Sequence, residues 1–322
     1  MMTLEGKRRL VIFLCATAVI LAAGIALFSL FHQEVPELMT EAELLAYMKE
    51  RYGIDFVICG VEDRGETENT LMGRIYWMYP EGNADMIITV SETIRIRPAL
   101  FPTDPVYGRS IYDSYTGDLF TQRMSKFLDN RKINYKRESN SDLIVYLEND
   151  TFAQQISDIC GFGNTLNEYA PFSTDAALYA SAAIFFSGSH GEITCYPFQT
   201  EKPYISMNED EIVASYIGDV FINYCIDFLD SNGIDYMKDA NNKLIIYLDE
   251  ENFYQQVKDI CAFGEGLNAQ SPFDTAVAAQ AQATIVFGKD FKIDMDSDCN
   301  PFQAQEPYIV MDADNILRSL EE

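Results

Sequence analysis

The chain has 322 residues, 48% of them hydrophobic and 13% aromatic, which is enough for two or three domains with buried cores. It contains 23 Lys and Arg against 50 Asp and Glu, a net charge of −27. A surface this acidic repels nucleic acid and anionic lipid head groups, which excludes nucleic-acid binding and leaves cations and basic proteins as partners. The same charge also keeps a domain soluble without any partner.

An uncharged apolar run, "LVIFLCATAVILAAGIALFSLF", occupies residues 10–31. As a helix it would extend about 33 Å, which spans a hydrocarbon core of about 30 Å. Lys7, Arg8 and Arg9 precede the run and four glutamates follow it within a dozen residues. The positive-inside rule then predicts a cytoplasmic stub at 1–9, a single-pass transmembrane helix at 10–31 in the cell membrane, and an extracytoplasmic remainder.

Two other interpretations of this run fit its residues less well. A cleaved signal peptide has an apolar core of about 7–15 residues followed by small residues, whereas this run is longer and ends in Phe-Ser-Leu-Phe-His. A lipoprotein would be acylated at Cys15, but Ile12, Phe13 and Leu14 precede that cysteine where small residues are needed. We therefore expect an uncleaved membrane helix.

The first module after this helix occupies residues 36–108. The segment "AELLAYMKERYGIDFVI" predicts a helix, a glycine stop and a strand, and the runs "MGRIYWMYP", "DMIITVS" and "TIRIRP" have strand composition. We predict a degenerate α-β-β-β module.

The phrase "LLAYMKERYGIDFVI", followed by strands and "IYDSYTGDLF", resembles uncharacterised membrane-anchored extracytoplasmic proteins of Gram-positive bacteria. Those proteins carry a helix that ends in a Lys-Tyr-Gly-Glu-Asp-Phe-like phrase, and a later Asp-x-Tyr. The resemblance covers about the first third of the chain. It implies membrane anchoring and a location in the cell envelope, and it supplies no catalytic residue.

A segment of about a hundred residues occurs twice. With an offset of 101, residues 115–174 align with residues 216–275 without a gap, and 27 of the 60 positions are identical. The phrase "FAQQISDICGFGNTLN" returns as "FYQQVKDICAFGEGLN"; further on the offset becomes 104, and "CYPFQTEKPYISM" matches "CNPFQAQEPYIVM". Such identity indicates an internal duplication, which predicts two copies of one fold but no activity.

Each copy begins with a helix, in which Phe120, Met124 and Leu128 recur at helical spacing. A strand, "DLIVYLE" or "KLIIYLDE", a second helix and a final β-hairpin follow. We therefore predict an α+β fold: an N-terminal transmembrane helix, the first module, and tandem α-β-α-β-β repeat modules at 109–207 (module A) and 208–322 (module B).

Four of the seven cysteines correspond between the copies, because Cys160 aligns with Cys261 and Cys195 with Cys299. In an oxidising compartment, a cysteine on the second helix and one near the last strand would form a disulfide worth about 2–4 kcal/mol. We predict the disulfides Cys160–Cys195 and Cys261–Cys299; buried free thiols are the alternative. Cys59 and Cys225 have no counterpart in the other copy.

The segment "DMDSDCN" places Asp294, Asp296 and Asp298 at alternate positions, as in the first half of a Ca²⁺ loop. Cys299 stands where that loop needs glycine, and Gln305 where it needs a bidentate glutamate. These aspartates are a candidate Ca²⁺ site; a solvated face of a strand is the alternative. No other cofactor is predicted.

No catalytic residue is assigned. His32 and His190 are the only histidines, and fifty acids supply so many carboxylate pairs that none stands out. Most of the forty Tyr and Phe residues fit core positions, and Tyr204 and Tyr308 are the candidates for exposed binding aromatics.

The function cannot be determined from these patterns. The interpretation that fits them best is a single-pass, membrane-anchored extracytoplasmic protein that binds an unknown envelope protein or a basic partner, and that is non-catalytic. The alternatives are a membrane-tethered hydrolase that uses carboxylates, and a spacer built from repeats.

Overall fold

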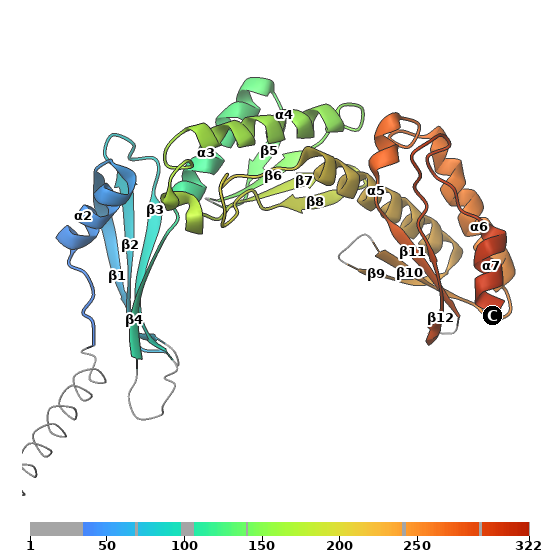
Figure 1. The fold of residues 1–322 in the computed structure, drawn as a ribbon, viewed down its shortest axis with the longest axis horizontal. Coiled ribbons are helices and arrows are strands. Elements are labelled where there is room, and N and C mark those ends of the chain that lie inside the picture. Colours follow the sequence, from blue (N-terminus) through green and yellow to red (C-terminus); the bar gives the residue numbers. More distant parts are fainter. Residues whose placement is uncertain are drawn as a thin grey trace, which may run out of the picture. The chain divides into compact units, whose positions relative to one another are not determined.

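The structure is a computed structural model in which the described residues are 35–67, 70–97, 106–139, 141–239, 243–289 and 292–321. The chain divides into two compact units, Met1–Asp113 and Ser114–Glu322. The described residues form six α-helices and three four-stranded sheets, one sheet in the first unit and two in the second (Figure 1).

The first unit contains one helix and an antiparallel sheet with strands in the order β1-β2-β3-β4. Its elements are α2 (Glu41–Tyr52), β1 (Phe56–Arg64), β2 (Thr70–Pro80), β3 (Ile88–Arg97) and β4 (Val106–Asp113). The helix begins at a capping box, in which Thr40 and Glu43 bond each other's backbone N–H groups. It ends at Gly53, whose φ of 72° lies in the left-handed region that favours glycine. The predicted helix is found, and β4 adds a strand that was not predicted.

The second unit contains two sheets built alike, which we call repeat A and repeat B. Repeat A consists of α3 (Tyr115–Arg131), β5 (Tyr135–Arg137), β6 (Asp142–Tyr146), α4 (Phe152–Thr165), β7 (Ala183–Ser187) and β8 (Glu192–Cys195). Repeat B consists of α5 (Glu209–Asn232), β9 (Asp235–Asp239), β10 (Lys243–Leu248), α6 (Phe253–Gly266), β11 (Thr284–Lys289) and β12 (Lys292–Cys299), and α7 (Ala313–Glu321) follows. Figure 1 shows α3 and α4 over one face of the repeat A sheet.

The predicted fold class is wrong, because the described chain is mixed α/β. In each repeat the middle strands are parallel, β6 with β7 and β10 with β11, and the outer pairs are antiparallel. Helices α4 and α6 make the crossovers that parallel neighbours require. The order in each repeat is α-β-β-α-β-β, since the short strands β5 and β9 were not predicted. The segments "ALYASAAIFFSG" and "VAAQAQATIVFG" each have the composition of one long strand, but each begins within a 3-10 helix (Asp175–Tyr179 or Ala276–Gln280) that precedes β7 or β11.

The predicted transmembrane segment, residues 10–31, lies outside the described residues. Among the described residues, one helix has the length and apolar composition of a membrane span, and it is the internal helix α5. Its apolar window is 67% buried within the structure. Helix α5 is therefore a core helix of the second unit.

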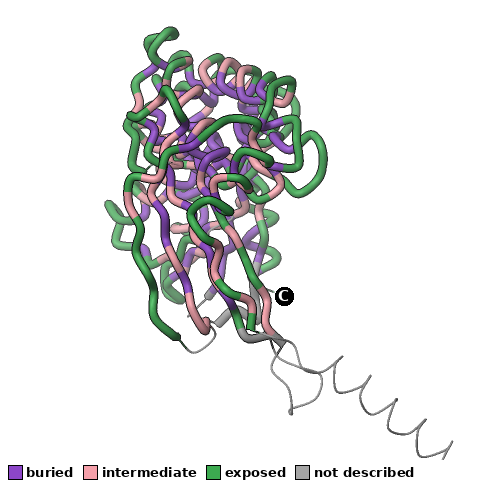
Figure 2. Tube along the Cα trace, turned by 90° about the vertical axis from the view of Figure 1, so that its left-hand side faces the viewer, coloured by how far each residue is buried: buried purple, intermediate pink, exposed green. Residues whose placement is uncertain are grey.

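Both repeats contribute to one hydrophobic core. Figure 2 shows the buried segments of the chain in purple. Helix α5 supplies residues to it along most of its length, from Ile212 near its start to Leu229 near its end. The side chain of Asp219 in the middle of α5 accepts the backbone N–H of Glu192 in β8 at 2.8 Å. One helix therefore completes the core of repeat A and begins that of repeat B.

The repeated phrase around the cysteines has a structural explanation. The side-chain amide of Asn167 donates to the carbonyl of Ile205 at 2.7 Å and accepts its N–H at 2.9 Å, and Asn268 holds Ile309 in the same way at 2.7 and 2.8 Å. The glycine of the phrase leaves room for a methionine, because a Cβ at Gly163 would lie 2.4 Å from the Sδ atom of Met207. The phrase thus fixes the last loop of each repeat against its second helix.

Candidate functional site

Three tyrosines of repeat A are largely exposed. The exposed fractions are 54% for Tyr169, 66% for Tyr179 and 72% for Tyr196. Tyr169 follows the short 3-10 helix after α4, Tyr179 ends the next 3-10 helix, and Tyr196 directly follows β8. We call these three residues the repeat A tyrosines. Large aromatic rings exposed on a soluble domain are more typical of binding surfaces than of ordinary surface.

Repeat B has a polar amide at each equivalent position. Tyr169 corresponds to Gln270, Tyr179 to Gln280 and Tyr196 to Asn300, and all three amides are exposed. The loops that carry them have the same hydrogen bonds: the backbone of residue 199 bonds residue 204 at 2.9 Å, and that of residue 303 bonds residue 308 at 2.9 Å. The two repeats therefore have similar loop conformations and differ in the side chains that they expose at these three positions.

The segments that carry the repeat A tyrosines are joined to each other. The hydroxyl of Tyr204, in the loop after β8, donates to Asp175 of the 3-10 helix that ends at Tyr179, with an O–O distance of 2.6 Å. In repeat B, Asn300 lines an open pocket with residues 281–284. The equivalence of the repeats thus places Tyr196 beside the residues that follow Tyr179.

The two tyrosines predicted to be exposed are buried. Tyr204 has 6% of its surface exposed and Tyr308 has 9%. The hydroxyl of Tyr204 donates to Asp175, which raises the pKa of this tyrosine, and the hydroxyl of Tyr308 donates to Glu306 at 3.3 Å. Both residues lie in loops that fold back on themselves, since the N–H of Gln199 bonds the Tyr204 carbonyl and that of Gln303 bonds the Tyr308 carbonyl, each at 2.9 Å.

The described cysteines are all free thiols, so the disulfides predicted for Cys160–Cys195 and Cys261–Cys299 are not present. The cysteines of each predicted pair do lie near each other, because each pair interacts electrostatically. Burial raises the pKa to about 12 for Cys160 and Cys261 and to about 11 for Cys195 and Cys299. These thiols act as small apolar side chains of the core.

Free buried thiols predict a defined pattern of alkylation. At pH 8, Cys59, which is exposed, is expected to react with iodoacetamide in the native protein, while the four buried cysteines, Cys160, Cys195, Cys225 and Cys261, react only after denaturation. Mass spectrometry of the peptides measures this. A disulfide between Cys160 and Cys195 in the non-reduced digest would contradict the free-thiol state.

The same thiols predict a dependence of stability on pH. In the unfolded chain they ionise near pH 8.5–9, whereas the folded state keeps them neutral to higher pH. Their contribution to stability is therefore complete below about pH 8.5, and it is lost as the pH rises toward the folded pKa values of about 11 and 12.

The predicted Ca²⁺ ligands Asp294, Asp296 and Asp298 all lie on β12. Asp298 is exposed and pairs in register with Val286 of β11. The side chains of the other two lie outside the described residues. The described residues contain no group of three or more acidic, cysteine or histidine side chains arranged for a metal ion, and the Ca²⁺ site stays a prediction.

His190 lies at the joint between the repeats. Its ring stacks on Tyr224 of α5 with 4.5 Å between centroids, and its carbonyl accepts from Asn223 at 2.8 Å. A small pocket beside it is lined by this pair, by Ser189 and by Tyr216. Two glycines of the β7–β8 hairpin make the close approach, since a Cβ at Gly188 would lie 1.8 Å from the Tyr216 hydroxyl. His190 thus contributes to the packing of the β7–β8 hairpin against α5.

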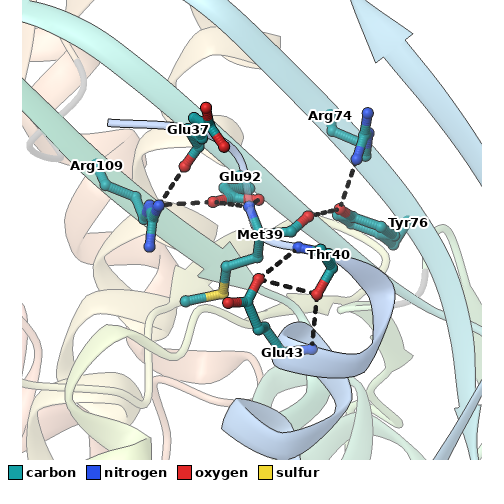
Figure 3. A network of polar contacts seen from close by, with 8 residues as sticks. All are labelled: Glu37, Met39, Thr40, Glu43, Arg74, Tyr76, Glu92 and Arg109. Carbon is teal, nitrogen blue, oxygen red and sulfur yellow. Dashed lines mark hydrogen bonds and ion pairs between the residues drawn. The ribbon is translucent and has the colours of Figure 1, made fainter. Parts of the chain in front are cut away.

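A polar clamp holds the start of the first unit (Figure 3). Glu92 of β3 has no exposed surface, and its two carboxylate oxygens each accept the backbone N–H of Met39 at 3.0 Å. Arg109 of β4 pairs with Glu92 at 3.2 Å and donates to the carbonyl of Glu37. The hydroxyl of Tyr76 donates to the Met39 carbonyl at 3.2 Å. Three side chains of the sheet therefore bind the backbone of the segment that precedes α2.

A second polar contact joins the two phrases that carried the family resemblance. Tyr52, at the end of α2, donates its hydroxyl to Asp113 at 2.5 Å, and Arg51 lies 3.6 Å from the other oxygen of that carboxylate. Asp113 is 7% exposed. The tyrosine before the glycine and the aspartate of the later Asp-x-Tyr thus form one buried contact between helix and sheet.

No family model, no curated protein and no solved structure matches this chain.

The repeat A tyrosines were missed in the sequence because the comparison of the copies followed their identities. The signal lies in the differences, where "NEYAPF", "ALYA" and "CYPF" of the first copy stand against "NAQSPF", "AAQA" and "CNPF" of the second. At each of the three positions a tyrosine is replaced by an amide. The core positions around them change little.

Proposed function

We propose that the protein is a non-catalytic interaction protein of the cell envelope, and that the repeat A tyrosines bind its partner. The observation that carries the proposal is the contrast between two copies of one fold. Three exposed tyrosines in repeat A face solvent where repeat B has Gln270, Gln280 and Asn300. A scaffold that serves only as a spacer has no need of exposed rings in one copy.

The rings provide the chemistry of a binding surface. Tyrosine presents a large, rigid apolar face and a hydroxyl at low cost in side-chain entropy, and it is enriched at the centre of protein interfaces. Tyr179 and Tyr196 have no hydrogen-bond or ring partner within the described part of the chain. Their faces are therefore open to a second molecule.

Site-specific photo-cross-linking in cells tests this proposal. A photoreactive phenylalanine analogue is placed at position 179 or 196 of the full chain, and cross-linked species are identified by mass spectrometry. We expect one recurrent adduct from both positions. The adduct should be reduced about thirtyfold or more when the other two repeat A tyrosines are replaced with the residues of repeat B, because two interface tyrosines at about 1–2 kcal/mol each contribute at least about 2 kcal/mol.

The controls use the repeat itself. The same analogue at Gln280 samples the equivalent position of repeat B, and at Tyr254 it samples an exposed tyrosine, 48% accessible, on α6. Adducts of equal yield at positions 179, 280 and 254 would mean nonspecific contact and would overturn the proposal. Loss of the adduct without loss of protein abundance distinguishes lost binding from lost folding.

The location in the envelope is a proposal from the sequence, based on the charge distribution around the apolar residues 10–31. Cys59 is exposed in the first unit and can report on it. A membrane-impermeant maleimide applied to intact cells should label the protein, and the Cys59→Ser variant should lose that label. Labelling only after the cells are lysed would place the first unit inside.

A further inference from the structure

We propose that the partner of the repeat A tyrosines presents a segment rich in lysine and arginine. This inference rests on the proposed function and specifies the chemistry of the partner. It is carried by two observations: cations of the chain already stack on rings of this region, and the segments that bear the open rings are acidic.

Rings in repeat A hold cations of the chain itself. The guanidinium carbon of Arg123 lies 5.9 Å from the ring centre of Tyr169 and 5.5 Å from that of Phe172. The ammonium of Lys202 lies 5.4 Å from the ring centre of Tyr204. The faces of tyrosine rings attract cations electrostatically within about 6 Å. Tyr179 and Tyr196, the most exposed of the repeat A tyrosines, have no such cation among the described residues.

The segments that carry these rings contain more acidic than basic residues. Residues 166–179 and 196–211 contain one basic residue, Lys202, which already stacks on Tyr204. The same two segments contain six exposed acids: Glu168, Asp175, Glu201, Glu209, Asp210 and Glu211. A lysine or arginine side chain that stacks on an open ring therefore finds carboxylates beside it, and the net charge of −27 attracts a basic segment from a distance.

Charge alone does not select repeat A. The equivalent segments of repeat B, residues 267–280 and 300–315, contain four acids and no base: Asp274, Glu306, Asp312 and Asp314. What repeat B lacks is the three rings. A basic partner bound by charge alone would not distinguish the repeats, whereas one that stacks on tyrosine binds repeat A.

The experiment uses purified full-length protein in detergent and a fluorescein-labelled peptide of ten residues in which lysine and glycine alternate. We compare the natural chain with the variant Y169Q/Y179Q/Y196N, which has the side chains of repeat B and an unchanged net charge. We expect the variant to bind the lysine peptide about tenfold more weakly in fluorescence anisotropy at 0.15 M salt, since each exposed cation–ring contact contributes a factor of about 2–5.

The reciprocal variant Q270Y/Q280Y/N300Y, made in the background of the first, transfers the rings to repeat B. It should restore a tight-binding site, and a peptide with glutamate in place of lysine should bind neither protein. Circular dichroism establishes that the variants are folded, which is expected because all six positions are exposed.

Equal affinity of the natural chain and the first variant for the lysine peptide would overturn the inference, because the binding would then be due to net charge. Binding of a neutral chito-oligosaccharide, but not of the lysine peptide, in a tyrosine-dependent way would overturn it in favour of a glycan. Neither outcome affects the proposed function if cross-linking at position 179 persists. If specific cross-linking is absent and peptide binding does not depend on the tyrosines, the proposed function and this inference are both contradicted.

Discussion

Replacement of Glu92 by alanine is expected to lower the free energy of unfolding of the first unit by about 3 kcal/mol. The change removes a fully buried carboxylate that accepts the N–H of Met39 and pairs with Arg109. The arginine loses its ion pair and the Met39 N–H loses its acceptor. Because the Arg109 side chain is 35% exposed, water offsets part of the cost, and the lower end of the range for broken buried pairs applies.

Trp77, the only tryptophan of the chain, lies on β2 of the first unit and reports on this prediction. In urea, the midpoint of the Trp77 fluorescence transition should fall for Glu92→Ala. The control is Glu43→Ala, which removes an exposed carboxylate of the α2 capping box and should produce a smaller shift. Equal shifts for the two variants would contradict a special role of the buried pair.

In the second unit, Asp219→Ala is expected to lower the free energy of unfolding by about 2–3 kcal/mol. Asp219 is 6% exposed and accepts three hydrogen bonds, from the Glu192 N–H at 2.8 Å, from Lys238 at 2.7 Å and from Asn223 at 3.1 Å. The first of these bonds joins α5 to the last strand of repeat A. Without the carboxylate, the Glu192 N–H loses its acceptor, and the amide of Asn223 keeps only its bond to the His190 carbonyl.

Far-ultraviolet circular dichroism follows the second unit, which contains most of the helix. Its urea transition should move for Asp219→Ala while the Trp77 transition stays in place. Asp219→Asn is the matched control: it retains an acceptor oxygen without the charge, and about half of the effect is expected. A Trp77 transition that moves in parallel would show that the two units unfold together.

Much of the fold could be predicted from the sequence where its signals are long and periodic. The duplication, the helix at Glu41–Tyr52 and the two helices of each copy follow from repeated phrases and helical spacing. The class was wrong for two physical reasons. Strand β5 has three residues, too few for an alternating pattern, and its counterpart β9 is a polar run, "DYMKD". The order of elements along the chain also does not show which strands are neighbours in the sheet. The parallel pairing of the strands on either side of α4 and α6 was therefore not predicted.

The candidate site could be predicted only in part. Cysteine spacing led to two predicted disulfides, but the thiols are free, because a cysteine in a core position packs as a small apolar side chain without a disulfide. For tyrosines, the decisive quantity is exposure, which depends on how a loop folds back. Tyr204 is buried by such a loop, while Tyr196, eight residues earlier and also beside a proline, is the most exposed tyrosine of the three.

The continuity of helix α5 has a consequence for how the second unit opens and closes. Two repeats that folded independently would exchange their amide hydrogens at separate rates. Here the twenty-four residues from Glu209 to Asn232 form one continuous helix, and its residues belong to the hydrophobic core that both repeats share. Opening of either repeat must break this helix or separate it from the core residues that it packs against. We therefore expect the slowest amide exchange at the centre of α5, and we expect the two repeats to unfold as one cooperative unit.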